Sequence, residues 1–258
     1  MPSFVWERDT ADAWLEPYEY GGQEQFQREA KKVISLLKDH YSQKDMQFNR
    51  DERSLEKALW LIQVDALEAI SDALVLTEEK RHRIAARMFR DAVETMDTSA
   101  YFYLAKDKAT TDLEKWYENE VIPHRKFRTF IRDYECKDKA KDLSELYRDL
   151  SKYTHRTHSA IMRSYILGRK NSIAYAGFSK GDFRVLPHVI SFSYAVIAAL
   201  IKRFITVAEN TEQLSSSEAE SIWKNSLEKK TVPRRFGTGP GQIMRGPLME
   251  INLEEDES

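Results

Sequence analysis

The sequence contains a single cysteine, Cys136, among its 258 residues. One thiol excludes a disulfide within the chain and any zinc cluster built on several cysteines. Acidic side chains occur within the first dozen residues, where a secretory signal would be basic and then apolar. We therefore expect a cytoplasmic protein.

Proline and glycine are also scarce, with seven and nine residues, and no long apolar run is present. The longest run, 189–201, is shorter than the ~20 residues that cross a bilayer, so we expect a buried core helix and no membrane partner. Few turn-forming residues, together with 41% hydrophobic and 32% charged residues, favour a helix-rich globular protein.

Helical periodicity predicts an all-α fold, a bundle of about six to eight helices with a flexible C-terminal tail. A first helix follows the loop signal Tyr20–Gly22, with its apolar stripe at Phe26, Ala30, Val33, Ile34, Leu37 and Tyr41. Ser54 caps a second helix, and Thr77 with Glu78 and Glu79 begins a third that runs to Leu104. Later helices are expected from Thr111 or Asp112 to Pro123, from His124, from Leu143 to Leu167, from Pro187 to about Glu209, and near Ser216.

These helices indicate one main domain at 24–210. An N-terminal extension at 1–23 precedes it, and a polar helix and linker at 211–230 follow. The tail at 231–258 contains three of the seven prolines and four of the nine glycines. That composition is typical of a flexible segment.

Charge is unevenly distributed, although the net charge is only -2. Residues 124–170 contain thirteen Lys and Arg against six Asp and Glu. Such a segment is typical either of a solvated helix surface or of contact with a polyanion such as RNA, and both interpretations stay open.

The third predicted helix has a polar stripe opposite its apolar face. Its members recur at spacings of three and four residues: Arg83, Arg87, Arg90, Glu94, Asp97 and Tyr101. They are either a ladder of surface ion pairs or the lining of a groove or interface.

The helix predicted at 143–167 has Asp142 and Glu145 as an acidic capping box. Its core face would include Leu143, Leu146, Tyr147, Leu150, Thr154 and Ile161. Arg148, Ser151 and His155 share its flank, with His158 nearer the core. Arg148 and His155 are two turns apart, roughly 10 Å along the axis, so their side chains can meet on one ligand. A guanidinium that holds phosphate beside an imidazole that moves a proton is suited to RNA cleavage without a metal.

The stretch RDLSKYTH, Arg148 to His155, resembles the motif of the HEPN superfamily, helical domains that include many metal-independent ribonucleases of toxin–antitoxin and phage-defence systems. The resemblance implies that Arg148 and His155 are catalytic and that Asp149 fills the polar position after the arginine. It also implies an RNA substrate, a cognate antitoxin or other partner protein, a homodimer, and no cofactor or metal.

A second resemblance covers about residues 50–210. RMFRDAVETMDTSAYF together with LYRDLSKYTHRT is similar to an uncharacterised all-helical bacterial family with an L-S-x-x-x-H signature. The matching polar positions are Arg87, Asp91, Ser151 and His155, and no established activity comes with them. We take Ser151, His158, Arg87 and Arg90 as candidate substrate-binding residues.

Two other interpretations of the histidines stay open. His155 and His158 could be structural residues that donate hydrogen bonds within a non-catalytic scaffold that recognises a partner protein. They could also bind zinc, but no third ligand stands at a recognisable spacing.

The composition of the tail leads to a first prediction. Truncation after Lys230 should leave the melting temperature nearly unchanged, because a solvated segment adds little buried surface. Thermal unfolding followed by circular dichroism would measure this, and a drop of many degrees would show that the tail docks on the domain.

Overall fold

The computed structural model describes most of the chain between residues 4 and 228. The described residues are 4–15, 18, 20–134, 145, 147, 148, 150, 158, 161, 165–167, 173–175 and 187–228. The predicted tail at 231–258 lies outside them.

Helices dominate the described residues, which confirms the all-α fold. The long helices are α3 (Tyr20–Ser42), α4 (Leu55–Glu78), α5 (His82–Leu104) and α10 (Pro187–Asn210). The shorter ones are α1 (Phe4–Glu7), α2 (Thr10–Leu15), the 3₁₀ helix η1 (Lys106–Ala109), α6 (Thr110–Tyr117), α7 (His124–Tyr134) and α11 (Ser216–Ser226). Two three-residue strands, β1 (Tyr165–Leu167) and β2 (Ile173–Tyr175), pair antiparallel, with Tyr165 opposite Tyr175.

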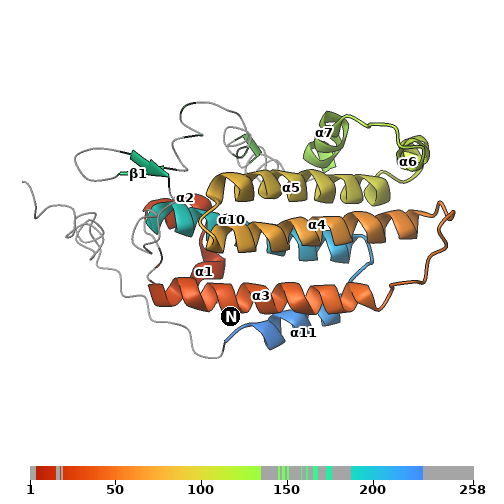
Figure 1. The fold of residues 1–258 in the computed structure, drawn as a ribbon. Coiled ribbons are helices and arrows are strands. Elements are labelled where there is room, and N and C mark those ends of the chain that lie inside the picture. The colour runs from red at the N-terminus through yellow and green to blue at the C-terminus, as the bar shows by residue number, and fades with distance from the viewer. Residues whose placement is uncertain are drawn as a thin grey trace, which may run out of the picture.

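The four long helices form the body of the bundle (Figure 1). Helix α4 packs against α5 and α3, and α10 packs against all three. Helix α11 lies on the outer side of α3, while α6 and α7 lie beside the C-terminal half of α5 (Figure 1). The bundle thus leaves one end of α5 covered by two short helices rather than a long one.

Local sequence signals account for the main helices. The whole apolar stripe predicted for the first helix is buried. Ser54 Oγ accepts a hydrogen bond from the Lys57 amide at the start of α4, as predicted, and α10 begins at Pro187. Helix α11 begins at Ser216 after a reciprocal capping box between Ser215 and Glu218.

The N-terminal segment contributes to the same core. Trp6, Ala13 and Tyr18 are buried. The Trp6 indole donates to Glu29 at 2.8 Å, and the Tyr18 amide donates to Ser191 Oγ at 2.8 Å. Residues before the first predicted helix therefore join α3 to α10.

Three predicted helix boundaries are wrong. The helix expected to reach Pro123 ends, as α6, at Tyr117. Helix α3 starts at Tyr20, so both glycines of the YGG loop signal lie in its first turn. Helix α4 runs to Glu78, and its Thr77 hydroxyl donates to the Ala73 carbonyl instead of capping a third helix. A threonine hydroxyl can satisfy either role. The turn to α5 is made at Lys80, whose φ is 62°.

The predicted helix at 143–167 also needs correction. Leu150 is buried and Tyr147 half-buried, as a core face requires, but Ile161 is exposed. Residues 165–167 form β1 rather than the last helical turn. The prediction assumed one helix of constant pitch as far as Leu167, and its core assignment of Ile161 is wrong. Asp142, Leu143, Leu146 and Thr154 lie outside the described residues.

Residues 189–210, most of helix α10, are long and apolar enough to cross a membrane by length and composition. In the protein, however, 61% of its most apolar window is buried against the rest of the chain. The central helix of a soluble bundle has the same properties.

A buried polar network inside the bundle leads to a second prediction. The Gln63 amide donates to Ser99 Oγ at 2.7 Å and Thr211 Oγ1 at 2.8 Å, and its carbonyl accepts from the Tyr41 hydroxyl. Gln63→Leu keeps the volume but leaves the Tyr41 donor without this acceptor, so the free energy of unfolding should fall by about 1–3 kcal/mol. Urea titration would measure it.

The matched control is Gln47→Leu, because Gln47 is exposed and its side-chain amide donates to the nearby Gln43 carbonyl. Equal effects of the two changes would contradict the role of Gln63.

Candidate functional site

Tyr147 joins the two stretches of sequence that carry the second family resemblance. Its hydroxyl donates to Glu94 Oε1 on α5 at 2.5 Å. Its ring lies 3.8 Å from the Arg128 guanidinium carbon of α7 and stacks on His124, with 5.5 Å between ring centroids. Tyr147, the residue before Arg148, is therefore fixed against both α5 and α7.

Glu94 is the shared acceptor at this junction. Arg90, one turn earlier on α5, donates from Nε to Glu94 Oε1 at 2.7 Å, and its guanidinium also lies over the Tyr147 ring. Burial acts to raise the pKa of Glu94, but the hydrogen bonds from Tyr147 and Arg90 and the nearby His124 outweigh it. The pKa stays below its usual range, so Glu94 is ionised at neutral pH.

Asp97, one turn further along α5, is a fully buried carboxylate. Arg203 of α10 donates from Nη2 to its Oδ1 at 2.7 Å, and His124 Nε2 lies 3.2 Å from its Oδ2. The other His124 nitrogen lies 3.8 Å from Glu94 Oε1. The imidazole thus bridges two carboxylates of α5 from the first residue of α7.

A second buried contact holds the short helices α6 and α7 against α5. Asp112 of α6 accepts from the Tyr101 hydroxyl at 2.5 Å and pairs with Lys126 of α7 at 2.5 Å. Burial and then the Asp112 hydrogen bond raise the pKa of Tyr101. Helices α5, α6 and α7 therefore meet around one neutral phenol and one paired carboxylate.

The predicted stripe on α5 is only partly a surface ladder. Arg87 is exposed and Arg90 and Glu94 form an i, i+4 pair, as surface residues do. Asp97 and Tyr101 are buried, because α7 and α10 cover the C-terminal half of the helix. The C-terminal half of the stripe is therefore an interface with other helices, and not a ladder of surface ion pairs.

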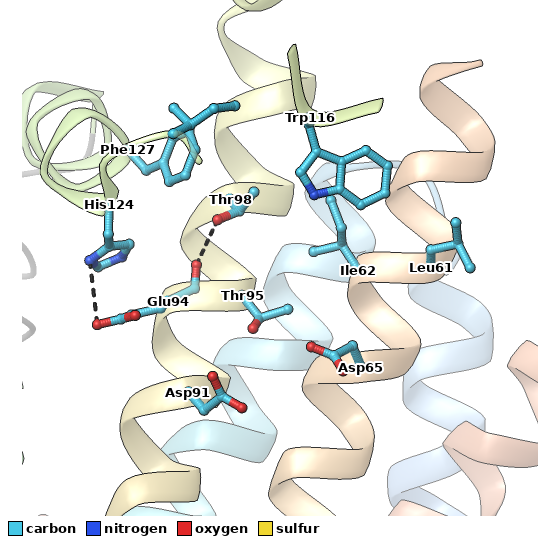
Figure 2. A pocket seen from close by; sticks show the side chains of 11 residues that line it. Leu61, Ile62, Asp65, Asp91, Glu94, Thr95, Thr98, Trp116, His124 and Phe127 are labelled. Atoms are coloured by element: carbon cyan, nitrogen blue, oxygen red, sulfur yellow. Dashed lines mark hydrogen bonds and ion pairs between the residues drawn. The ribbon is translucent and has the colours of Figure 1, made fainter. Parts of the chain in front are cut away.

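A cleft of about 470 Å³ opens beside this cluster, between α4, α5, α6 and α7 (Figure 2). Its polar lining comes mainly from α4 and α5 and its aromatic lining from α6 and α7. The lining residues are Leu61, Ile62, Asp65, Asp91, Glu94, Thr95, Thr98, Trp116, Ile122, His124 and Phe127. Figure 2 shows His124 on one side, facing Glu94, and Trp116 on the other.

The structure places only part of the predicted catalytic set. Arg148 is exposed beside Tyr147, and His158 is exposed rather than close to the core. His155, Asp149 and Ser151 lie outside the described residues. The separation of Arg148 and His155 therefore stays a prediction.

Several members of the polar cluster were not predicted from sequence. Tyr147 was assigned only to a core face, and His124, Arg128 and Arg203 were assigned no role. His124 follows Pro123 at a helix start, which is a local signal, but no spacing relates position 124 to positions 97 and 203. In the described part of the chain no group of three or more His, Cys, Asp or Glu is arranged to hold a metal ion.

No protein-family model matches this chain, and comparison with curated proteins and with solved structures finds no significant similarity.

The buried carboxylate leads to a third prediction. Asp97→Asn removes the charge that Arg203 and His124 face, and loss of one member of a buried ion pair costs roughly 3–5 kcal/mol in typical proteins. We expect a loss at the lower end of this range in the free energy of unfolding, because the Arg203 side chain is 17% exposed.

Chemical denaturation would measure the loss, with Asp133→Asn as the control. Asp133 forms an exposed pair with Arg132 at 2.9 Å, and such pairs contribute at most about 1 kcal/mol. A change at Asp97 as small as the control's would contradict the proposed electrostatic role.

Proposed function

We propose that this chain is an RNA-binding effector with a HEPN-like, metal-independent ribonuclease site around Arg148 and His155. One observation supports it most. The Tyr147 side chain, next to Arg148 in the chain, packs against α5 and α7, so a described residue of the later stretch of the second resemblance contacts the earlier stretch. A site assembled from both stretches requires that proximity.

The exposed charge around this junction is positive on balance, although Asp133 and Glu145 are also exposed. Helix α7 has exposed Arg125, Lys126 and Arg132, and Arg148 is exposed next to Tyr147 in the chain. Phosphate groups bind such surfaces with release of counterions, largely without regard to sequence. We place the RNA backbone on this α7 face and away from the carboxylates of the neighbouring cleft.

The chemistry proposed is transesterification by the RNA itself. His155 takes the proton of the ribose 2′-hydroxyl, whose oxygen attacks phosphorus as the bond to the 5′-oxygen breaks. The leaving 5′-oxygen receives a proton from an imidazolium, and the products are a 2′,3′-cyclic phosphate and a 5′-hydroxyl. Arg148 stabilises the charge on the phosphoryl oxygens, with Asp149 as the adjacent polar group. Ser151, His158, Arg87 and Arg90 would contact the substrate, and a homodimer would bring two such pairs together.

This mechanism leads to a fourth prediction. Purified protein should cleave RNA in EDTA and leave 2′,3′-cyclic phosphate ends, which end-specific labelling would detect. His155→Ala should reduce the rate at least ~100-fold, the usual contribution of a general acid or base. Arg148→Lys should also lose most activity, because an ammonium lacks the two-pronged grip of a guanidinium.

Arg28→Lys is the matched control for the arginine, since Arg28 is exposed on α3, outside the proposed RNA-binding face, and paired with Glu228. It should retain activity within about twofold, because charge is preserved at a position outside the reacting centre. Cleavage that EDTA abolishes, or that survives His155→Ala, would overturn the mechanism.

The alternative is a non-catalytic scaffold that recognises a partner protein. The observation that favours it is that Arg90 and Tyr147 both donate hydrogen bonds to Glu94, as residues with a structural role do. In that case varied RNA substrates would show neither cleavage nor binding. His155→Ala would instead lower the free energy of unfolding by ~1–3 kcal/mol, the cost of an unsatisfied buried partner.

A further inference from the structure

The cleft between α4 and α7 has carboxylates but little compensating positive charge. Asp65 faces it from α4, and Asp91 and Glu94 face it from α5 (Figure 2). Among the described residues, neither Asp65 nor Asp91 makes a hydrogen bond or ion pair, whereas Glu94 is held by Arg90 and Tyr147. Of the side chains that line the cleft in the described structure, His124 alone can carry a positive charge.

Two neighbouring carboxylates disfavour the ionisation of Asp91. The Asp91 residue is exposed, but its partial desolvation, followed by the negative charges of Asp65 and Glu94, raises its pKa above the usual value. A bound cation would relieve this repulsion, and an anion would increase it. The arrangement therefore favours a positively charged ligand.

The rest of the lining is suited to an organic ligand rather than a bare ion. Trp116 and Phe127 provide aromatic surface, and Leu61 and Ile122 provide aliphatic surface. Trp116 is held in place by an edge contact with Phe102, at 6.2 Å between centroids. A volume of about 470 Å³ is within the range of small-molecule sites. Tryptophan is also the best aromatic partner for a cation.

We propose that this cleft binds a small organic cation, an ammonium group on a short hydrocarbon stem. The ammonium would lie between Asp65 and Asp91, and the stem would pack against Trp116 and Phe127. This inference goes beyond the proposed function and does not depend on RNA cleavage.

The test uses three probes of equal length and different charge: pentylamine, pentanol and pentanoate. Isothermal titration calorimetry on the full chain should show that pentylamine binds at least tenfold more tightly than the other two. Its affinity should fall as salt rises, because the carboxylates are open to solvent screening. A blocked peptide with one central lysine would distinguish two sources of the ammonium group, the lysine of a partner protein and a free amine. Tighter binding than pentylamine would assign the cleft to a partner's lysine, and weaker binding to a free amine.

The deciding variant is the double change Asp65→Asn and Asp91→Asn, which keeps side-chain size and removes both charges. It should weaken pentylamine binding at least tenfold, whereas Asp72→Asn should change it less than twofold. Asp72 is exposed on α4, two turns from Asp65, and does not line the cleft. Circular dichroism melts would confirm that all variants fold.

Two results would overturn the proposal. One is a lack of preference for the amine: either the three probes bind with equal affinity, which would indicate apolar binding alone, or pentylamine does not bind at any concentration up to its solubility limit. The other is pentylamine binding that the double variant leaves unchanged, which would place the amine elsewhere on the protein.

Discussion

A buried negative charge on α5 requires positive charge from elsewhere in the chain. Asp97 is removed from water, and an isolated carboxylate in that position would be very costly. Arg203 of α10 and His124 of α7 both reach it. The requirement to neutralise one residue therefore ties a long central helix and a short peripheral helix to the same point on α5.

The same arrangement determines where the candidate sites lie. Because His124 starts α7 at Asp97, the helix runs beside the C-terminal half of α5 and presents Arg128 to the Tyr147 ring. The exposed face of α7 then has the basic residues that we assign to RNA. Its opposite side, together with Trp116 of α6, forms one wall of the cleft. A basic surface and an acidic cleft thus lie on two sides of one eleven-residue helix.

Much of the fold could be predicted because its signals are local. The apolar stripe of α3, the Ser54 cap and the proline that opens α10 each depend on residues within a few turns. Thr77 misled the prediction because a threonine hydroxyl can cap a helix or bond back to the preceding turn, and only the packing of α4 decides between them. The polar cluster depends on contacts between residues 97, 124, 147 and 203. Sequence spacing contains no information about such contacts, so only the α5 members of the cluster were identified in advance.

The three-residue connection between α4 and α5 affects the order in which the protein folds. Two helices joined so closely can pair with a small loss of loop entropy. By contrast, the contact between Asp97 and Arg203 spans 106 residues, and that between Gln63 and Thr211 spans 148. An α4–α5 hairpin formed early would therefore leave Asp97 without Arg203, and Gln63 without Thr211, until α10 docks. Docking of α10 would bring Arg203 and the following Thr211 to both polar groups in one step, which favours a cooperative late stage of folding over gradual addition of helices.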